Sequence, residues 1–498
     1  MTETSLPLSL YTAEQVREMD RIAIEEKAIP GLTLMQRAAQ AAFDILSTQV
    51  IKHKRILICC GSGNNGGDGY LLACIAKNNG YDVTVFAACE GDILQGDAKH
   101  AYAQWQQASG QIISFEQLSE VLNEVDLIVD ALFGTGLARD ITGSWAEIIN
   151  DINGANKPVL AIDIPSGLNA NTGNVMGVAI IANQTISFIG LKQGLYTGVG
   201  RDYCGDIYFN DLDIPQAIID AIQPSCEVIA PDCVQQRLPK RAASAHKGQC
   251  GHVLLVGGDV GMSGAIQLSA EAAIRSGAGL VSIATRSQHA VEITTHRPEL
   301  MCHGVEMIED LQSLLSKVSV VAIGPGLGQS EWAQMMLQTV LASDLPIVVD
   351  ADALNLISQQ NVKRNNWVLT PHPGEAARLL DCYNADIQRD RFVAIKKIAQ
   401  QYNAVVALKG SGTLVLDNKT QHCFLCRDGN PGMASGGMGD LLTGVIAALI
   451  AQGLSLIDAT CCGVQLHAHA ADQAGLSGER GMIATDLLPF IRQQINEN

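Results

Sequence analysis

The sequence predicts two doubly wound α/β domains, and three observations carry this prediction. Short β-branched runs alternate with longer helical stretches through both halves of the chain. A chain of 498 residues is too long for one ordinary core. Its 47% hydrophobic and 4% aromatic residues, with 48 glycines, are typical of a Gly- and Ala-rich α/β enzyme.

The first half begins with two helices and continues with a series of strands. Residues 12–15, "TAEQ", fit a capping box, and the helical pattern that follows ends at Pro30 and Gly31. A second helix is expected around 34–46. The expected strands are "RILICC", "YDVTVFA", "DLIVDALF", "KPVLAIDIP" and "QTISFIG". Helical stretches separate them, which predicts a parallel, Rossmann-like sheet.

The alternation of strands and helices is interrupted at about 212–247, a stretch with four prolines and a basic cluster. We therefore expect a first domain over 1–217, a linker region over 218–245 and a second domain over 246–498. The second series begins with "HVLLVGG" and a helix through "IQLSAEAAIRSG". Its further strands are expected at "LVSIAT", "VSVVAIG", "PIVVDAD", "NWVLTP" and "NAVVALKG". The two halves share this plan without a visible sequence repeat.

The charge of the chain excludes nucleic acid as an expected partner. Acidic residues outnumber basic ones 51 to 33, a formal charge of -18 that repels phosphate backbones and anionic lipid surfaces. No secretory signal is visible at the N-terminus. The most apolar stretch, 441–454, is shorter than the roughly 20 residues that span a bilayer, so we expect a buried helix and no membrane association.

The cysteines indicate a reducing compartment. All 14 are scattered, mostly through apolar runs, as expected of thiols that act as small core hydrophobes. We therefore expect a cytoplasmic protein. The one CxxC, Cys423 and Cys426, lacks a second pair or a helical His pair that would complete a zinc site, so we interpret both as strand residues.

A glycine-rich turn, "GSGNNGGDGY" at 61–70, follows the strand "RILICC" with GxGxxG spacing. Backbone N–H groups of such a turn can approach a phosphate. A hydride-transfer site is less favoured, because Asp68 in the first helical turn would repel a pyrophosphate. The spacing alone is weak evidence, since many strand-to-helix turns have it for packing.

Polar side chains also follow two later strands of the first half. Asp130 ends one of them, and Asp163 with Ser166 ends another. Ligands of open α/β sheets bind at the carboxyl ends of the strands, where these loops would meet. Two aspartates and an asparagine would suit a hard cation. The alternative is that each aspartate only caps the turn that follows it.

The second half offers a different chemistry. The segment "GNPGMASGGMGDLLTG" places a glycine turn before Asp440, which can accept a proton while free N–H groups stabilise phosphoryl oxygens. The alternative is a plain helix cap. "LKGSGT" suits nucleotide phosphates, "TPHPGE" holds His372 between prolines, and "VVDADALN" ends a strand with Asp350 and Asp352. No P-loop is present. His467 and His469 diverge on a helix and are interpreted as structural.

The motifs "GNNGGDG", "DALFGTGL", "DIPSGLNANTG" and "FIGLKQGL" resemble the N-terminal epimerase domain of the NAD(P)H-hydrate repair enzymes, over about 10–215. The resemblance implies interconversion of (R)- and (S)-NADHX and NADPHX, the C6-hydrated cofactors. It implies a potassium ion held by Asn65, Asp130 and Ser166, and Asp163 as the proton-transfer group at the nicotinamide ring. The substrate contacts that it implies besides Asp163 are Asn64, Asn65, Gly66, Gly67, Asp68, Gly134, Thr135, Gly136, Leu137, Ala138, Arg139 and Asp140.

The second half resembles the dehydratase domain of the same enzymes, a relative of the ribokinase-like kinases, over about 230–495. The motifs that carry this resemblance occur in order: "SGAIQLSAEAAIRSGAGLV", "GPGLG", "DADALN", "TPHPGE", "KGSGT" and "GGMGD". It implies that Ala265, Gly326, His372 and Asp440 contact the substrate. It also implies that the adenine nucleotide is held by Lys409, Gly410, Ser411, Gly412, Thr413 and Gly439.

The kinship with kinases implies a mechanism for dehydration. Asp440 would deprotonate the C6 hydroxyl, which attacks the terminal phosphoryl group, and loss of the phosphate would restore the ring double bond. The fused architecture resembles the bacterial type, which implies ADP as the donor and AMP as a product. Magnesium is expected because a divalent ion usually bridges nucleotide phosphates, although the sequence does not identify its ligands.

Three functions remain open from the sequence. The first is a bifunctional repair enzyme that acts on the small molecules NADHX, NADPHX and ADP, expected as a homo-oligomer. The second is a ribokinase-like small-molecule kinase with an N-terminal nucleotide-binding domain. The third is a non-enzymatic NAD-sensing module. A kinase releases a stable phosphorylated product, the repair enzyme releases inorganic phosphate and reduced cofactor, and a sensor turns over neither epimer.

Overall fold

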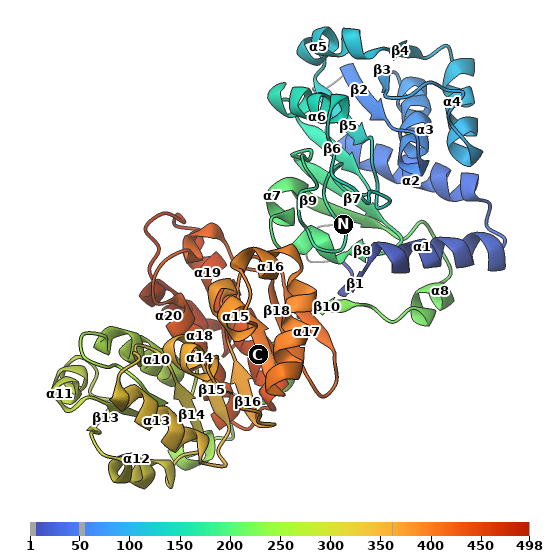
Figure 1. Cartoon of the computed structure of the whole chain (residues 1–498). Coiled ribbons are helices and arrows are strands. Elements are labelled where there is room, and N and C mark those ends of the chain that lie inside the picture. The colour runs from blue at the N-terminus through green and yellow to red at the C-terminus, as the bar shows by residue number, and fades with distance from the viewer. Residues whose placement is uncertain (1–5, 49–54, 361, 498) are drawn as a thin grey trace. The chain divides into compact units, whose positions relative to one another are not determined.

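The computed structural model describes residues 6–48, 55–360 and 362–497. It divides into two compact units, Met1–Glu227 and Val228–Asn498 (Figure 1). The division falls inside the 218–245 segment that the sequence analysis assigned to a linker. In the described part of the chain, no helix is both long and apolar enough to cross a bilayer.

The first unit is built on a parallel sheet of seven strands in the order β4-β3-β2-β5-β6-β7-β9. The strands are β2 (Arg55–Cys60), β3 (Asp82–Ala87), β4 (Gln111–Ile113), β5 (Leu127–Ala131), β6 (Val159–Ile162), β7 (Gln184–Phe188) and β9 (Asp206–Asn210). The order reverses between β2 and β5, so a crevice forms beyond the carboxyl ends of these two strands. The predicted Rossmann-like doubly wound sheet is confirmed. A short strand β1 (Ser9–Tyr11) pairs with β8 (Leu191–Lys192), and β10 (Cys226–Val228) ends the unit.

The helices of the first unit begin as the sequence predicts. The capping box of α1 (Ala13–Arg21) is confirmed, because Thr12 Oγ1 accepts from the Gln15 N–H at 3.3 Å and Gln15 Oε1 accepts from the Thr12 N–H at 2.9 Å. A π-helical turn (Ile22–Glu26) continues it. The second helix, α2 (Gly31–Thr48), starts directly after Pro30 and therefore earlier than expected, and the Pro30 carbonyl accepts from the Thr33 and Leu34 N–H groups.

Successive residues of β2 pack on opposite faces of this sheet. Ile56 and Ile58 lie in the core with α2, α3 (Asn64–Asn78) and α4 (Gly96–Gln107). Figure 1 shows these three helices grouped beside the sheet. Leu57 and Cys59 lie in the core with α5 (Phe115–Glu124) and α6 (Ser144–Gly154). Both faces are therefore covered, as a parallel sheet requires. Two short helices, α7 (Gly200–Cys204) and α8 (Gln216–Ala221), complete the unit.

The second unit contains nine strands in the order β13-β12-β11-β14-β15-β16-β17-β18-β19. They are β11 (His252–Val256), β12 (Leu280–Thr285), β13 (Met301–Gly304), β14 (Val320–Ile323), β15 (Ile347–Val349), β16 (Trp367–Leu369), β17 (Val405–Leu408), β18 (Thr413–Asp417) and β19 (Cys423–Cys426). The strands up to β17 are parallel, and β18 and β19 are antiparallel. The order again reverses beside the first strand, between β11 and β14. The two units therefore share a chain path, as predicted.

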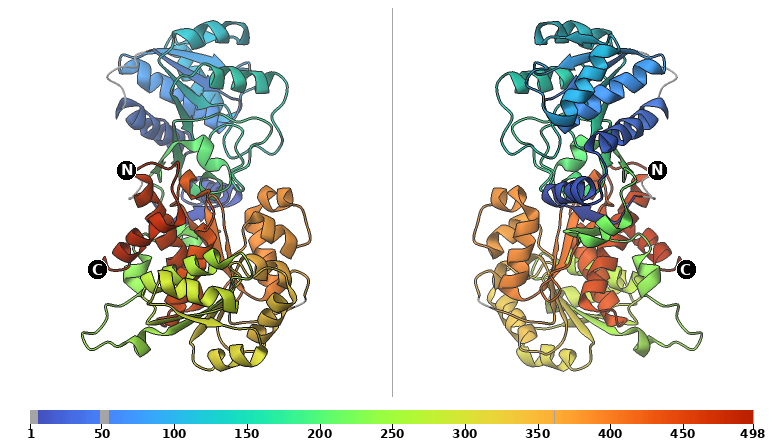
Figure 2. Two further views of the ribbon diagram at one scale, coloured as in Figure 1. Left: turned by 90° about the vertical axis from the view of Figure 1, so that its left-hand side faces the viewer. Right: turned by 90° about the vertical axis from the view of Figure 1, so that its right-hand side faces the viewer.

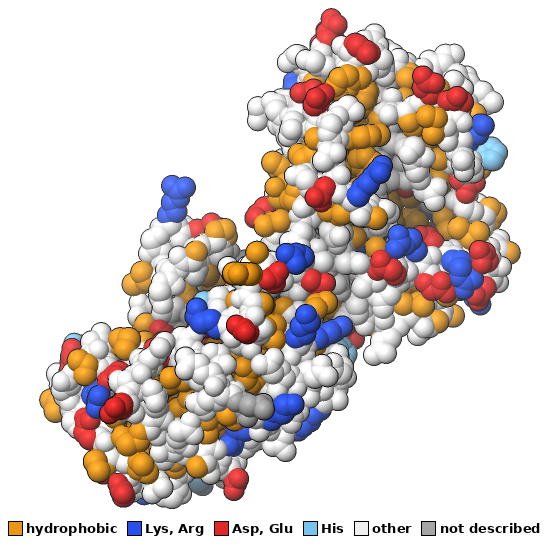
Figure 3. All heavy atoms as spheres, in the orientation of Figure 1, with side chains coloured by type: hydrophobic (Ala, Val, Ile, Leu, Met, Phe, Trp, Pro, Cys, Tyr) orange, Lys and Arg blue, Asp and Glu red, His pale blue; other side chains and the backbone are white. Residues whose placement is uncertain are grey.

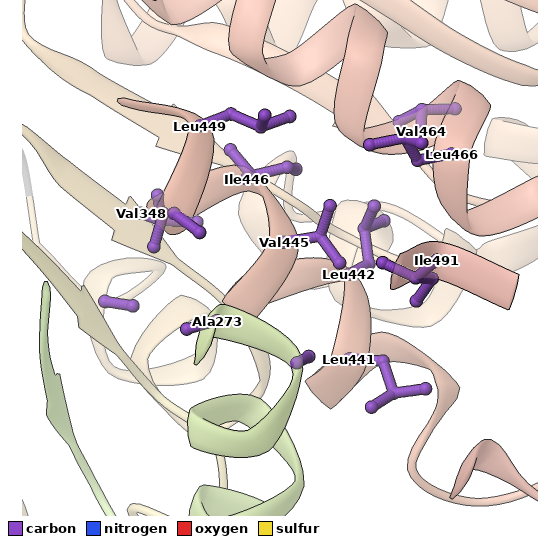
Figure 4. Packing of buried hydrophobic residues seen from close by; sticks show 14 of the residues in the cluster. Ala273, Val348, Leu441, Leu442, Val445, Ile446, Leu449, Val464, Leu466 and Ile491 are labelled. Atoms are coloured by element: carbon purple, nitrogen blue, oxygen red, sulfur yellow. The ribbon is translucent and has the colours of Figure 1, made fainter. Parts of the chain in front are cut away.

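Helices cover both faces of the second sheet, which the turned views of Figure 2 show. The apolar stretch at 441–454 forms most of α18 (Met438–Ala451), and the predicted buried helix is confirmed. Leu442, Val445 and Ile446 of α18 pack in one core with α10 (Ser263–Arg275) and α19 (Leu456–Gly475) (Figure 4). Cys423 and Cys426 are strand residues, as predicted, and all 14 cysteines are free thiols.

The remaining helices connect the strands or flank the sheet. They are α9 (Cys233–Arg237), α11 (Ser287–His296), α12 (Ile308–Leu315), α13 (Glu331–Leu341), α14 (Ala351–Ile357), α15 (Pro373–Leu379), α16 (Asn384–Arg389), α17 (Arg391–Tyr402) and α20 (Leu488–Gln494).

Candidate active sites

A cavity of about 1040 Å³ opens in the first unit beyond the carboxyl ends of β2, β5 and β6. It lies at the point where the strand order reverses, the usual position of a ligand in such a sheet. The predicted substrate residues that line it are Asn64, Asn65, Asp68, Gly134, Thr135, Gly136, Leu137, Ala138, Arg139 and Asp163. The predicted Gly66, Gly67 and Asp140 are not among its lining residues.

The glycines of the turn after β2 allow close backbone packing. A Cβ on Gly61 would lie 1.9 Å from the Leu132 carbonyl oxygen, and one on Gly66 would lie 2.0 Å from the Gly61 carbonyl oxygen. Neither position has room for a side chain. The GxGxxG spacing thus serves the fit of strand to helix, and the side chains of Asn64 and Asp68 are left to face the cavity.

A buried carboxylate, Asp130, lies at the end of β5. The Ser166 backbone N–H donates to its Oδ2 at 2.7 Å, and the Ser166 hydroxyl donates to its Oδ1 at 2.6 Å. Burial raises the pKa of Asp130 to about 6, although the hydrogen bonds from Ser166 oppose this shift. Two of the three predicted potassium ligands are therefore in direct contact.

The third predicted ligand, Asn65, is buried with its amide unsatisfied. Its side chain is 8% exposed, and neither Oδ1 nor Nδ2 has a hydrogen-bond partner among the described residues. A buried amide without a partner is costly, so its presence points to a group that binds there. Carbonyl, hydroxyl and carboxylate oxygens are the donors that a hard cation prefers. The residues present therefore fit a potassium ion.

An ion pair between Lys192 and Asp163 stands beside the first cavity, which Asp163 lines. The fully buried Lys192 ammonium donates to Asp163 Oδ1, to Ser187 Oγ at 3.1 Å and to the Phe188 carbonyl at 3.0 Å. Asp163 has φ of +68°, a left-handed conformation that is rare for a residue other than glycine and that often marks a functional site. The sequence analysis quoted Lys192 within a motif but gave it no role; its one signal is a charge inside a buried apolar run.

Two further carboxyl groups share this electrostatic environment. Asp20 on α1 lines the cavity, and burial raises its pKa to about 6, with Lys192 lowering it and Asp163 raising it further. Burial, and then the charges of Asp163 and Asp20, also raise the pKa of Asp68 well above its usual range. Two acids with raised pKa values therefore stand near the ion pair of Lys192 and Asp163. Nothing in the sequence around Asp20 indicates this role.

In the second unit, Asp440 lies in the first turn of α18. Gly437 caps this helix with φ of +89°, and the Ser269 hydroxyl donates to the Asp440 carbonyl at 2.7 Å. Burial and the neighbouring Asp350 charge raise the pKa of the Asp440 side chain to about 7. A carboxyl group with this pKa can accept a proton near neutral pH.

A buried lysine joins three of the predicted loops. Lys409 Nζ donates to Asp350 Oδ1 at 2.7 Å, and the Thr443 hydroxyl donates to Asp350 Oδ2 at 2.8 Å. A Cβ on Gly439 would lie only 3.1 Å from Lys409 Nζ. Burial lowers the pKa of Lys409, but Asp350 and Glu375 outweigh it and the pKa is raised. The lysine is therefore charged where the nucleotide is predicted.

The predicted substrate contacts lie on neighbouring loops. Gly326 has φ of +57°, and a Cβ on it would lie 2.5 Å from the Met262 carbonyl oxygen and 3.2 Å from the Ala265 Cβ. His372 caps α15, where its Nδ1 accepts from the Gly374 N–H at 3.0 Å. Burial, and then the charge of Lys409, lower the pKa of His372. Both effects favour the neutral imidazole.

A buried guanidinium supports the predicted nucleotide loop. Arg391 is 2% exposed and donates to the carbonyls of Leu408 and Gly412, both at 3.1 Å. Burial lowers its pKa to about 10. The positive φ angles of Gly410 (+137°) and Gly412 (+66°) shape the turn around it. The sequence analysis missed Arg391, which reads as an ordinary charge at the start of a helix.

A second support holds the loop that leads to Asp440. Asp472 accepts from the Gly429 N–H at 2.8 Å and from Asn430 Nδ2 at 2.9 Å. Within the described ranges, Asp428, His469 and Asp472 are the one group of His, Cys, Asp and Glu side chains close enough together to hold a metal. Their hydrogen bonds to the loop and the 3.3 Å contact of His469 with Asp428 explain this cluster without a metal.

Two family models match the chain. The model described as YjeF-related protein N-terminus matches residues 31–194, and the one described as NAD(P)H-hydrate dehydratase matches residues 253–493. The first match covers the loops around Asn65, Asp130 and Asp163. The second covers those around His372, Lys409 and Asp440.

Relatives match over nearly the whole chain. The bifunctional NAD(P)H-hydrate repair enzyme of Coxiella burnetii is 46% identical over 98% of this chain and 99% of its own. The enzyme of the same name from Escherichia coli is 42% identical over 99% of this chain and 95% of its own.

Solved structures match the second unit. A ribokinase-like superfamily protein of Enterococcus faecalis has a TM-score of 0.51 and 29% identity, covering 54% of this chain and 95% of that one. A hypothetical protein of Streptococcus mutans also has a TM-score of 0.51, with 27% identity, covering 54% of this chain and 99% of that one. These matches confirm the predicted ribokinase-like fold.

Proposed function

The chain belongs to the family of bifunctional NAD(P)H-hydrate repair enzymes, and we propose that each unit performs one of the two reactions. The first unit interconverts (R)- and (S)-NAD(P)HX, and the second dehydrates (S)-NAD(P)HX to NAD(P)H. The observation that carries this proposal is a full-length relative at 46% identity together with a separate polar site in each unit. The resemblance seen in the motifs is thereby confirmed at the level of the family.

Asp163 is the proton-transfer group of the epimerase site. Inversion at C6 requires the hydroxyl proton to leave as a carbonyl forms at C6 and the C6–N bond breaks, with its electron pair passing to the ring nitrogen. The nitrogen then attacks the other face of the carbonyl, and the oxygen takes the proton back. Asp163 lines the cavity, and Lys192 holds its carboxylate in place and balances its charge. Asp20 and Asp68, whose pKa values are raised by burial, can hold the proton in the interval.

Asn65, Asp130 and Ser166 would hold a potassium ion beside the first cavity. The buried, partnerless amide of Asn65 and the oxygen-only donor set support this assignment. The ion would supply positive charge near the phosphates or the ring of the substrate. The remaining contacts, from Asn64 to Asp68 and from Gly134 to Asp140, would bind the hydrated cofactor.

Asp440 is the base of the dehydratase site. It removes the proton from the C6 hydroxyl, whose oxygen then bonds to the terminal phosphorus of the nucleotide as the bridging oxygen leaves. Loss of the phosphate from C6 and of a neighbouring ring proton restores the double bond. The pKa of about 7 supports this role, because a base is most effective when its pKa lies near the working pH. Ala265, Gly326 and His372 would position the hydrated ring.

The nucleotide would lie on the turn Lys409–Thr413 and on Gly439. We propose ADP as the donor, which makes AMP and inorganic phosphate the other products. Lys409 supplies a buried positive charge, and the glycine turns supply N–H groups for the transferring phosphoryl group. Magnesium would bind with the nucleotide phosphates, which a divalent ion usually bridges, because Asp350, Asp352 and Glu375 do not form a ligand cluster among the described residues.

A ribokinase-like kinase with an N-terminal nucleotide-binding unit is the second candidate function. Incubation with the two NADHX epimers and either ADP or ATP separates the candidates by the return of reduced-nicotinamide absorbance and by released inorganic phosphate. Recovery of both epimers with stoichiometric phosphate supports repair. A stable phosphorylated product would indicate the kinase, and binding without turnover would indicate the NAD-sensing module.

We also propose a cytoplasmic location and a homo-oligomeric state. The free thiols of all 14 cysteines support a reducing compartment. The oligomeric state stays a prediction from the sequence, and sedimentation velocity at several concentrations measures it.

A further inference from the structure

A second cavity, of about 880 Å³, opens in the second unit and is lined by positive charge. Its cationic lining residues are Lys240, Arg241, Arg275, Arg297 and Arg492. Glu299 is the one acidic residue among the residues that line it. The formal charge of the whole chain is -18, and Figure 3 shows acidic and basic side chains interspersed over the visible surface. Five cations around one concavity therefore stand out against the rest of the chain.

Two of the five guanidinium and ammonium groups are fixed by the protein. Arg241 donates to the Gly277 carbonyl and, at 2.8 Å, to Gln452 Oε1, and Arg297 forms an ion pair with Glu271. The Nε of Arg297 is buried and has no hydrogen-bond partner among the described residues. In the same part of the chain, no carboxylate forms an ion pair with Lys240, Arg275 or Arg492. Fixed and unpaired cations thus surround the same space.

Helix ends explain only part of this charge. Arg275 lies in the last turn of α10 and Arg492 in the last turn of α20, where a cation complements the helix dipole. Arg297 is the C-cap of α11, so Lys240 and Arg241 are the two that lie at no helix end. Helix capping therefore explains why some of these cations occur, but not why all five line one cavity.

The cavity is separate from the dehydratase site. Gln452, which follows α18, lines it and donates to the Ser276 carbonyl at 2.8 Å, whereas Asp440 lies in the first turn of the same helix. Twelve residues of α-helix rise about 18 Å. The proposed catalytic residues therefore do not reach this space.

We propose that this cavity binds a small anion with two or more phosphate groups. Its volume lies in the roughly 300–1,000 Å³ range of small-ligand sites. A guanidinium group can donate two parallel hydrogen bonds to the oxygens of one phosphate. A cluster of four arginines therefore suits a ligand with more than one phosphate group. The acidic charge of the chain opposes a long polyanion such as nucleic acid, so a compact ligand fits better than a polymer. The site lies outside both reactions assigned above.

The test measures binding of inorganic pyrophosphate to the full chain by titration calorimetry without magnesium. The double variant Arg275→Glu/Arg492→Glu reverses two unpaired charges in the cavity. The matched control, Lys396→Glu/Lys419→Glu, makes the same charge change at exposed positions of the second unit that line neither cavity. Dehydration of NADHX by each variant reports that the second unit is folded, and Arg275→Gln/Arg492→Gln repeats the test without new negative charge.

We expect the native chain and the control to bind one more pyrophosphate than the cavity variant, or to bind it at least tenfold more tightly. The glutamine variant should fall between them. Equal site numbers and affinities in the cavity variant and the control would overturn the proposal. A change in oligomeric state of the cavity variant with no change in pyrophosphate binding would also overturn it, and would identify this surface as a protein interface.

Discussion

The two active sites occupy equivalent positions on their sheets and arrange a lysine and an aspartate in opposite ways. In each unit an aspartate follows the second strand beyond the point where the order reverses, β6 for Asp163 and β15 for Asp350. A buried lysine pairs with each of them, Lys192 with Asp163 and Lys409 with Asp350. In the first unit the paired Asp163 lines the cavity. In the second, Asp350 is held by Lys409 and Thr443, and the proposed proton acceptor is Asp440 on α18.

This difference follows from what each site must bind. An epimerase adds no new group, so the lysine can stay buried behind the aspartate that lines the cavity. A dehydratase that uses a nucleotide needs a cation for the phosphates, and the base must stand apart from it. Asp163 and Asp350 thus share a position at the end of a strand, and the groups around each aspartate determine its role.

The largest expected effect is on Asp440. We expect Asp440→Asn to slow dehydration about a thousandfold, because the amide cannot accept the hydroxyl proton. Epimerisation should be unchanged. Stopped-time assays of NADHX recovery and of R/S interconversion measure both rates, with the exposed Glu309→Gln as the control. Loss of both activities in Asp440→Asn would contradict the division between units.

A smaller loss is expected from the matching change in the first unit. We expect Asp163→Asn to slow epimerisation about a hundredfold, because Asp20 and Asp68 remain nearby to carry protons. Dehydration of pure (S)-NADHX should be unaffected. Chiral chromatography of the epimers follows the rate, with the exposed Asp151→Asn as the control. Undiminished epimerisation would remove Asp163 from its role.

The pH dependence of dehydration gives the next effect. Asp440 has a pKa of about 7, and only its charged form is a base, so kcat/KM should fall about tenfold per pH unit well below 7. The raised pKa of Asp440 acts on the free energy of unfolding in the opposite direction to its effect on the rate. The folded chain binds more protons than the unfolded one between about pH 4 and 7, so this group lowers the free energy of unfolding as pH rises through that window. A flat rate profile from pH 5 to 8 would contradict the assignment of Asp440.

The smallest effect concerns the support of the nucleotide loop. Arg391→Lys should raise the KM for ADP several-fold, because one ammonium group cannot replace the planar guanidinium that donates to both Leu408 and Gly412. The value of kcat should change less than KM, since the reacting groups are untouched. A fall in kcat as large as the rise in KM would place Arg391 in a different role.

The sequence predicts most strands and the order of the loops, because β-branched runs and glycine turns are local signals. It does not predict β1, β4, β8 and β10, which have only two or three residues each, and it also misses β9, β13 and β18. The candidate aspartates are visible because they end predicted strands. The sequence gives no such signal for Lys192, Asp20 and Arg391, because only folding brings their partners near them. Asp20 reaches the first cavity from a helix that precedes the sheet.

Complementation between two inactive variants tests the central claim, that each unit holds one complete and independent site. Pure (R)-NADHX is incubated with ADP and with Asp440→Asn, with Asp163→Asn, or with an equimolar mixture of the two chains. We expect NADH to form at near-native rate in the mixture and slowly with either chain alone, because the epimer made by one chain is dehydrated by the other. A mixture no faster than the single variants would contradict the claim.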